Sequence, residues 1–266
     1  ARDAFSMVLD YNANDYQAAG GGRAFTSHLS GPLQNSSPDL FSSDIRQMVV
    51  NHAAFSNNEG LAMAFRYDQR GRLVKSNSYY KNNSSWQSTS DYEASFSYDA
   101  NGNLTSLSRE GDQGLMDQLD YSYQQDKNRI DHVSDQVGDG SYPNDVDDQS
   151  PGNYQYDASG RLKQNLAEDI QNVRWSRHDR VKSVVKAGYG SVYSSYDATG
   201  FRVMKYHNTT DNKNKKLIRY VRGVNNQILA KYKYVPSKDS TYLTEQYIHG
   251  RSRLGTYSPD TTLQAM

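Results

Sequence analysis

Short stretches in which polar and apolar residues alternate run along most of the chain, and turn-forming residues separate them. In residues 65–67, 96–98 and 154–156, two aromatic residues stand two positions apart, which places each pair on one face of a strand. An Asp directly follows each of these stretches, and a Gly follows that Asp three positions later. No stretch of the chain predicts a convincing helix. The pattern therefore predicts an all-β chain of repeated hairpins.

A seven-residue motif underlies this pattern and recurs without gaps in four places. Its members are Tyr67, Asp68, Gly71 and Leu73; Tyr98, Asp99, Gly102 and Leu104; Tyr156, Asp157, Gly160 and Leu162; and Tyr196, Asp197 and Gly200, after which one extra residue precedes the aliphatic Val203. Two decayed copies begin at Tyr123 and Trp175. The six starts lie 19 to 33 residues apart, which fits two strands and two turns per unit with insertions.

The residues of the motif predict one kind of turn. Asp at the first turn position and Gly at the fourth favour a type I turn followed by a left-handed residue, which closes a hairpin with a G1 bulge. In that register Tyr67 faces Leu73 on one side of the sheet, and Asp68 faces Arg72 on the other. Ordinary hairpins of an antiparallel sandwich are the alternative, but four gap-free copies favour a true repeat.

The composition explains how such a polar chain can fold. The 266 residues have a mean hydropathy of −0.91, and 22 of the 31 aromatic residues are Tyr, which buries a ring and keeps a polar tip. This favours β structure with half-wet faces. The absence of Cys excludes disulfides, thiolate catalysis and zinc–thiolate sites. Aliphatic runs such as Met48–Val50 are only a few residues long, so neither a transmembrane helix nor a signal-peptide core is expected.

Three regions follow from these patterns. Residues 1–60 predict irregular strands and loops continuous with the sheet, because they hold too few apolar residues for a core of their own. Strands are expected at Leu40–Phe41 and Ile45–Val50, and an insertion loop at Asp135–Gln149. Residues 61–256 form the repeat region, and residues 257–266 form a tail. We expect the chain to be a fragment, a processed piece or the ordered part of a longer protein.

The candidate chemistry is sparse. The insertion loop carries oxygen ligands that suit Ca²⁺, but they lack EF-hand spacing, so a solvated acidic loop is favoured and no metal site is predicted. These residues are Asp139, Asn144, Asp145, Asp147 and Asp148. The six histidines are scattered, and neither His-Glu-x-x-His nor Gly-x-Ser-x-Gly occurs. We therefore predict no catalytic residue, no cofactor-binding residue and no enzyme activity.

Two further short motifs also predict loops. Gly20–Gly22 lacks the Gly-Lys-Ser/Thr ending of a phosphate-binding loop, and the basic run Lys213–Lys216 predicts a solvated hairpin tip. The 30 Lys and Arg balance the 30 Asp and Glu, and this zero net charge argues against a polyanion partner, so no nucleic acid is expected.

The motif resembles the YD repeat of the Rhs family, which includes bacterial polymorphic toxins, the C component of insecticidal toxin complexes and the shell of teneurins. Two later segments strengthen the resemblance. Residues Tyr220–Ala230 resemble the family stretch YVRDxxGNxLA, and Tyr247–Gly255 resembles the stretch YxYGxSRLG that opens the Rhs-associated core. The matching residues of the second are Tyr247, Gly250, Arg253, Leu254 and Gly255. The linkers are similar to those of Bacteroidetes members, and the resemblance covers roughly residues 60–256.

The resemblance implies an antiparallel ribbon of hairpins wound spirally into a hollow shell, of which this chain is an arc or fragment. In toxin members the shell encloses a C-terminal toxic domain. The core of those members ends near an Asp-Pro-x-Gly motif, where an Asp dyad cleaves the chain. No Asp-Pro occurs here, so no catalytic residue carries over.

The expected function is therefore a non-enzymatic shell segment that encloses or carries an effector, in a secreted or cell-surface bacterial protein without membrane insertion. The implied partners are the remainder of the same chain, a toxin domain, and a secretion or injection apparatus. The alternative is a cell-surface adhesion or glycan-binding module on the same repeat, because Tyr and Asn side chains stack on and hydrogen-bond to sugars. An enzyme is the third hypothesis, and it would need convergent His and carboxylate groups in a pocket.

Overall fold

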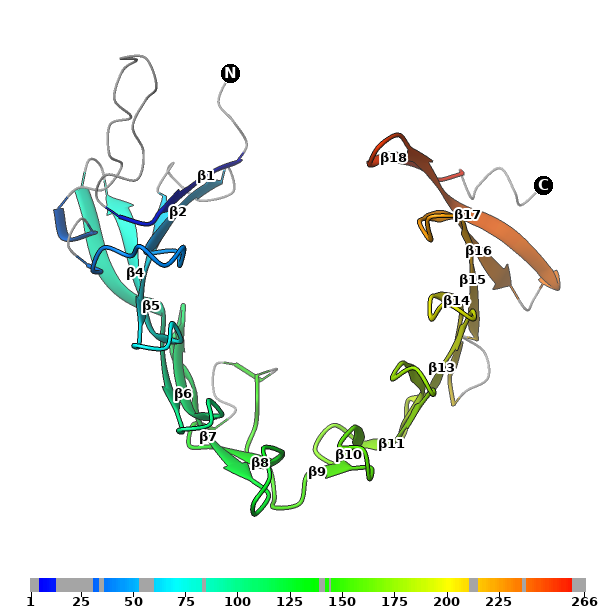
Figure 1. The fold of residues 1–266 in the computed structure, drawn as a ribbon, viewed down its shortest axis with the longest axis horizontal. Helices are drawn as coiled ribbons and strands as arrows, with labels where there is room; N and C mark the ends of the chain where they lie inside the picture. The colour runs from blue at the N-terminus through cyan, green and yellow to red at the C-terminus, as the bar shows by residue number, and fades with distance from the viewer. Residues whose placement is uncertain are drawn as a thin grey trace. The chain divides into compact units, whose positions relative to one another are not determined.

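Antiparallel hairpins account for both parts of the chain in the computed structural model (Figure 1). The structure describes residues 5–12, 31–33, 36–52, 60–82, 85–138, 142–143, 145–210, 215–235 and 238–259. They belong to two units, unit 1 (residues 1–150) and unit 2 (residues 151–266), and each unit contains one sheet. Apart from the short 3-10 turn η2 (Gly31–Leu33), the described residues contain no helix. The predicted all-β architecture of repeated hairpins is confirmed.

Unit 1 holds an eight-stranded open sheet whose strand order follows the chain. Its strands are β1 (Phe5–Asp10), β2 (Gln47–His52), β3 (Leu61–Tyr67), β4 (Leu73–Asn82), β5 (Ser85–Tyr98), β6 (Leu104–Gly111), β7 (Gly114–Tyr123) and β8 (Ile130–Asp135). Strands β1 and β2 extend the sheet of repeat hairpins on the side of β3. The boundaries at residues 60 and 256 that the repeat indicates stay a prediction.

Unit 2 holds a ten-stranded open sheet, again in chain order. Its strands are β9 (Tyr154–Tyr156), β10 (Leu162–Asn165), β11 (Ile170–Trp175), β12 (Val181–Lys186), β13 (Gly190–Tyr196), β14 (Arg202–Asn208), β15 (Lys216–Arg222), β16 (Ile228–Val235), β17 (Ser240–His249) and β18 (Arg253–Tyr257). Because each strand pairs antiparallel with its sequence neighbours, every second turn lies at the same end of the strands. We call the row of strand ends that carries the motif turns the repeat rim.

Unit 1 has a small apolar core. Trp86 on β5 is 1% exposed and packs with Tyr79, Ala62, Ala64 and Leu33. Since each strand is half polar, this cluster forms only where η2 covers β5. Among the described residues of unit 2, the buried apolar side chains are Val173 and Ala230 alone. Unit 2 is therefore a sheet with little packed against either face.

The N-terminal region corrects one strand prediction. The predicted strand at Ile45–Val50 appears as β2, two residues later, but Leu40–Phe41 forms no strand. Leu40 donates its N–H to the Tyr11 carbonyl, and Phe41 is 85% exposed, so this pair belongs to a loop beside the sheet. Two neighbouring apolar residues cannot by themselves supply the backbone partners that a strand requires.

The two units carry opposite charge. Lys and Arg number 11 in unit 1 and 19 in unit 2, whereas Asp and Glu number 21 and 9. Formal charges of −10 and +10 therefore cancel in the whole chain. The whole-chain balance, on which the argument against a polyanion partner depends, does not hold within either unit.

Candidate functional site: the repeat rim

The first motif copy shows how the turn is built. Gly71 donates its N–H to the Asp68 carbonyl over 3.0 Å, and Asp68 donates its N–H to the Arg72 carbonyl over 2.9 Å. Gly71 has a φ of 74°, which a side chain with a Cβ adopts only at a cost. Tyr67 pairs with Leu73 across the hairpin. These are the bonds and the register of the predicted type I turn with a G1 bulge.

The same pair of backbone bonds closes six of the described turns. The turns start at Asp68, Asp99, Asp157, Ser176, Asp197 and Gly223. In the copy at Tyr123 the turn is one residue longer, as its sequence predicts, and Gln124 reaches the Arg129 carbonyl. At the end of β17 the turn is shorter, and Gly250 donates to the Ser252 carbonyl. All eight turns lie on the repeat rim of their own sheet.

The Asp side chain acts as a brace inside the turn. Asp68 Oδ1 accepts the N–H groups of Arg70 and Arg72, and its Oδ2 receives Nε and Nη2 of Arg72 at 2.7 and 2.6 Å. The hydrogen bond from the Arg72 side chain is the main reason that the pKa of Asp68 falls to about 2. Asp157 repeats this arrangement with Arg161, which likewise lowers its pKa.

The decayed copies keep the geometry with other residues. Ser176 replaces the Asp, and its Oγ accepts the N–H groups of His178 and Arg180 at 3.3 and 3.2 Å. Asp179 stands at the Gly position with a φ of 53°, and Asn226 does so with a φ of 60°. Asn and Asp tolerate this left-handed region better than other residues with a Cβ. The turn survives because each replacement still supplies the acceptor or the backbone angle.

Two details of register differ from the sequence analysis. Tyr196 pairs with Arg202 rather than with Val203, so the fourth copy has no extra residue and a cation occupies its aliphatic position. The hairpin between Arg222 and Ile228 is a further copy of the turn, although its first residue is not aromatic. Its signal in the sequence is the spacing of Gly223 and Asn226, which matches that of Asp68 and Gly71.

The register also shifts just before each motif pair. Arg66 pairs with Lys75, but Tyr67 pairs with Leu73, so β4 holds one extra residue there. The ladder from β4 to β5 begins only at Lys75. The carbonyl of Leu73 therefore lies outside the ladder that joins this hairpin to the next.

The next aromatic residue of the rim satisfies that carbonyl. Tyr98 donates its hydroxyl to the Leu73 carbonyl over 2.8 Å. The same contact joins later copies, with distances of 2.7 to 3.1 Å. The pairs are Tyr123 with Leu104, Trp175 with Leu162, Tyr196 with Val181, Arg222 with Arg202, and His249 with Ile228. A polar tip is needed here, which explains why Tyr rather than Phe opens most copies.

Arginines add a second contact between neighbouring turns. The Arg72 guanidinium lies 4.6 Å from the centre of the Tyr98 ring and donates to the Asp99 carbonyl. Arg161 lies 5.9 Å from the Trp175 ring centre and pairs with Asp179 at 2.8 Å. Within each unit, a side chain of each repeat turn, aromatic in all copies but that of Arg222, thus fixes it to the turn before it, and in these two copies a cation adds a second contact.

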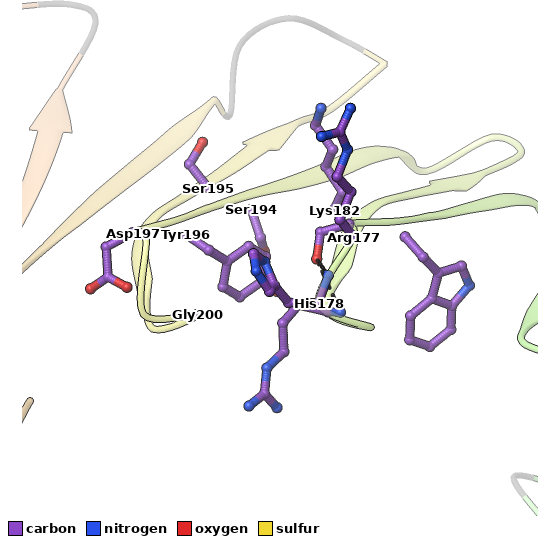
Figure 2. Close-up of a pocket in the computed structure, with 11 residues that line it drawn as sticks. Arg177, His178, Lys182, Ser194, Ser195, Tyr196, Asp197 and Gly200 are labelled. Atoms are coloured by element: carbon purple, nitrogen blue, oxygen red, sulfur yellow. Dashed lines mark hydrogen bonds between the residues drawn. The ribbon is translucent and has the colours of Figure 1, made fainter.

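Two hollows open between turns on the rim of unit 2. The first, of about 460 Å³, lies between Trp175 and Tyr196, with the Arg177, Arg180 and Lys182 side chains around it (Figure 2). The second, of about 530 Å³, lies between Tyr196 and the next repeat turn along the chain. It is lined by Phe201, Arg202, Tyr220, Arg222 and Lys231 among others. Among the described residues, Arg177, Arg180, Lys182 and Arg202 have no carboxylate partner. We call these two cavities the basic hollows.

The remaining candidate residues do not assemble into catalytic machinery within the part of the chain that is described. In the first hollow, the His178 ring makes no hydrogen bond to a Ser or Asp. Tyr220 lies on β15, Tyr247 on β17, Gly250 in the last turn, and Arg253, Leu254 and Gly255 on β18. The Gly20–Gly22 loop, Asp139, Asn144 and Lys213 lie outside the described residues. The absence of enzyme activity stays a prediction.

No described helix has the length and apolar character needed to cross a membrane.

Similarity of this chain to known proteins is found among solved structures. No family model and no curated protein matches it. Among solved structures, the crystal structure of TcdB2-TccC3-TEV aligns with 78% of this chain and 13% of its own, at 12% identity and a TM-score of 0.33. The Tc holotoxin pore of Photorhabdus luminescens aligns with 79% of this chain and 14% of its own, at 12% identity and a TM-score of 0.24. This chain thus spans 13–14% of the length of those chains.

Proposed function

We propose that this chain is a non-enzymatic wall segment of an Rhs-type shell, which encloses or carries an effector domain for export or delivery by a bacterium. The observation that carries the proposal is the repeat rim. The motif that resembles the YD repeat coincides with one turn geometry, and within each unit every such turn is joined to the next by a side-chain contact to a carbonyl.

The rim contact makes a hairpin repeat extensible. Among the described residues, the Tyr196 hydroxyl and the Trp175 indole N–H each hydrogen-bond to the copy before them, so a further hairpin can be added without a central core. The sheet of unit 2 buries few side chains. A sheet of this kind can be wet on both faces, as a thin wall between an interior and the outside requires.

The experiment uses the full-length protein purified from its natural source. Electron microscopy is expected to show a hollow particle, and protease treatment is expected to spare an enclosed polypeptide that becomes cleavable once the particle is unfolded. A particle without an interior, or uniform cleavage before unfolding, would overturn the proposal.

A surface module that binds acidic glycans is the second candidate, and the basic hollows favour it. Trp175, Tyr196 and Phe201 offer ring faces for stacking, and Arg177 and Arg180 offer charges without carboxylate partners. A glycan array probed with the full-length protein would test this function. Binding of sulfated or uronic-acid glycans that Arg180→Glu reduces at least tenfold would support it, whereas Lys163→Glu, outside the hollows, should leave binding unchanged. Absence of binding counts against it.

A further inference from the structure

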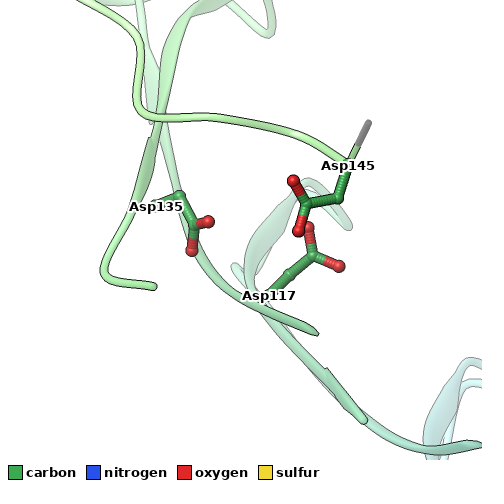
Figure 3. A group of neighbouring side chains, drawn as sticks. All are labelled: Asp117, Asp135 and Asp145. Carbon is green, nitrogen blue, oxygen red and sulfur yellow. The ribbon is translucent and has the colours of Figure 1, made fainter. Parts of the chain in front are cut away.

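Three aspartates from different segments meet on one face of unit 1. Asp117 lies on β7, Asp135 is the last residue of β8, and Asp145 lies in the segment that follows β8 (Figure 3). One carboxylate oxygen from each lies within 4.8 Å of the other two. In the sequence only Asp135 and Asp145 fall within the acidic insertion loop, and Asp117 is 18 residues upstream of Asp135.

The sheet register explains two of the three positions. Asp117 pairs with Arg109 on β6, and Leu119, two residues further along β7, pairs with Asp135. Residues two apart on a strand share a face, as do paired residues on neighbouring strands. Arg109, Asp117 and Asp135 therefore follow one another across the same face of the sheet.

Asp117 carries the observation that points to a ligand. Its side chain is fully buried, and its Oδ2 accepts a hydrogen bond from Arg109 Nε. Its Oδ1 is buried and has no hydrogen-bond partner among the residues that the structure describes. A buried charged oxygen without a partner is costly, and native structures compensate such oxygens with a donor, a water or an ion. The Asp117 carboxylate faces that of Asp145 (Figure 3).

The other two carboxylates also have oxygens to offer. Asp135 Oδ1 accepts the N–H groups of Gln118 and Val137 at 3.0 and 3.1 Å, which fixes the carboxylate in place, and no described residue hydrogen-bonds to its Oδ2. The Asp145 carboxylate accepts no hydrogen bond from another described residue. Burial and the charges of Asp117 and Asp135 raise the pKa of Asp145, and the charge of Arg109 offsets this rise only in part.

The segment that carries Asp145 is attached to the sheet on both sides of it. Tyr142 donates its hydroxyl to Asp112 Oδ1 over 3.1 Å, and Gln149 donates its N–H to the Val133 carbonyl and accepts the Val133 N–H. These contacts hold Asp145 over the aspartates of β7 and β8 rather than leaving it in solvent. The arrangement is not that of an exposed acidic loop.

We propose that Asp117, Asp135 and Asp145 bind one Ca²⁺ ion, with waters and backbone carbonyls completing its shell. Ca²⁺ prefers carboxylate oxygens at 2.3–2.6 Å, so its ligands lie at most roughly 5 Å apart, which the spacing of this cluster satisfies. Mg²⁺ fits less well, because it demands a tighter octahedron and keeps most of its water. The ion would fasten the segment after β8 onto the sheet, and this role is independent of the shell function.

The test uses the intact chain after removal of divalent ions with a chelator. Calorimetric titration with CaCl₂ is expected to show one saturable site, and excess Ca²⁺ should raise the melting temperature of unit 1 by roughly 5–10 °C at a hundred times the Kd. Asp145→Asn should weaken binding at least tenfold. The matched control is Asp147→Asn, which removes the same charge two residues away and should change the Kd less than threefold.

Terbium luminescence provides a second readout that does not depend on stability. Tb³⁺ excited through nearby tyrosines should be displaced by Ca²⁺ in the native chain, and its signal should be lost in Asp145→Asn. Equal weakening by the two Asn variants would show diffuse attraction to an acidic surface and would overturn the proposal. The same conclusion follows if Ca²⁺ leaves unfolding unchanged, or if Mg²⁺ binds more tightly than Ca²⁺.

Discussion

Unit 1 and unit 2 share the turns of the repeat rim and differ in almost everything else. Unit 1 is acidic, packs Trp86 and Leu33 into a small core, and gathers three aspartates on one face. Unit 2 is basic, buries few side chains and opens the basic hollows between its turns. The rim, with its hydrogen-bonded turns and aromatic contacts, is therefore sufficient to specify a hairpin sheet. Core and charge are free to vary around it.

The two tryptophans of the chain test the difference in packing. Trp86 is 1% exposed in the core of unit 1, whereas Trp175 is half-buried on the rim of unit 2. Trp86→Ala should lower the free energy of unfolding of unit 1 by about 3–5 kcal/mol, because it leaves a cavity. Trp175→Ala should cost unit 2 about half as much. Guanidinium unfolding followed by circular dichroism gives both values, and equal losses would contradict the contrast in packing.

Substitution of the glycine at the fourth position of the repeat turn tests the turn geometry that the two units share. Gly102→Val should destabilise unit 1 by about 1–3 kcal/mol, because its φ of 93° strains a β-branched residue. Gly160→Val, at a φ of 83°, should cost unit 2 a similar amount. A Cβ at Gly102 would lie 3.8 Å from its nearest neighbour, so steric overlap does not contribute.

Two controls sharpen this measurement. Gly102→Asn should cost less than Gly102→Val, since Asn226 adopts the same region in a native copy of the turn. Asn101→Ala should also cost less, because it loses only a 3.4 Å contact to Asn128. Equal melting shifts for Gly102→Val and Asn101→Ala would contradict the turn assignment.

The aromatic contact should be equivalent in the two units. Tyr98→Phe and Tyr196→Phe each keep the ring and remove the hydroxyl that binds the Leu73 or Val181 carbonyl. Each change should cost about 0.5–1.5 kcal/mol in thermal or denaturant unfolding. Tyr193→Phe provides the control, because Tyr193 is exposed and only stacks on Tyr206. If it costs as much as the rim variants, the hydroxyl contact is not the cause.

Lowering the pH is expected to produce the smallest of these changes in the stability of the two units. The pKa of Asp68 in the folded chain is about 2, below the ordinary value near 4, so its contribution to stability is complete above about pH 4 and is lost as the pH falls toward 2. Asp157 shows a shift in the same direction. Asp68→Asn should flatten this part of the stability profile of unit 1, and Asp157→Asn that of unit 2. An unchanged profile in both variants would show that the turn carboxylates do not set it.

The sequence predicts the rim well because its information is local. Tyr67, Asp68 and Gly71 lie within five residues, and propensity, turn type and pairing agree on them. The copy at Arg222 lacks both the aromatic residue and the Asp by which the motif is recognised, whereas its turn needs only backbone hydrogen bonds and the left-handed Asn226. The Asp117 cluster and the basic hollows could not be predicted, since they depend on the exact register between neighbouring strands and on the path of the segment that follows β8. At Leu40–Phe41 the local pattern is misleading: two neighbouring apolar residues predict a strand, but their backbone joins no sheet.

The strand order also bears on how the protein is made. Each strand of either sheet pairs only with the strand before it and the strand after it, so the relative contact order is low for an all-β protein. A nascent chain can close each hairpin as it leaves the ribosome, without waiting for a distant partner. During synthesis the latest strand is an exposed edge that could pair with another chain. A gene of this kind could gain or lose a hairpin by recombination, because only the two flanking contacts must be restored.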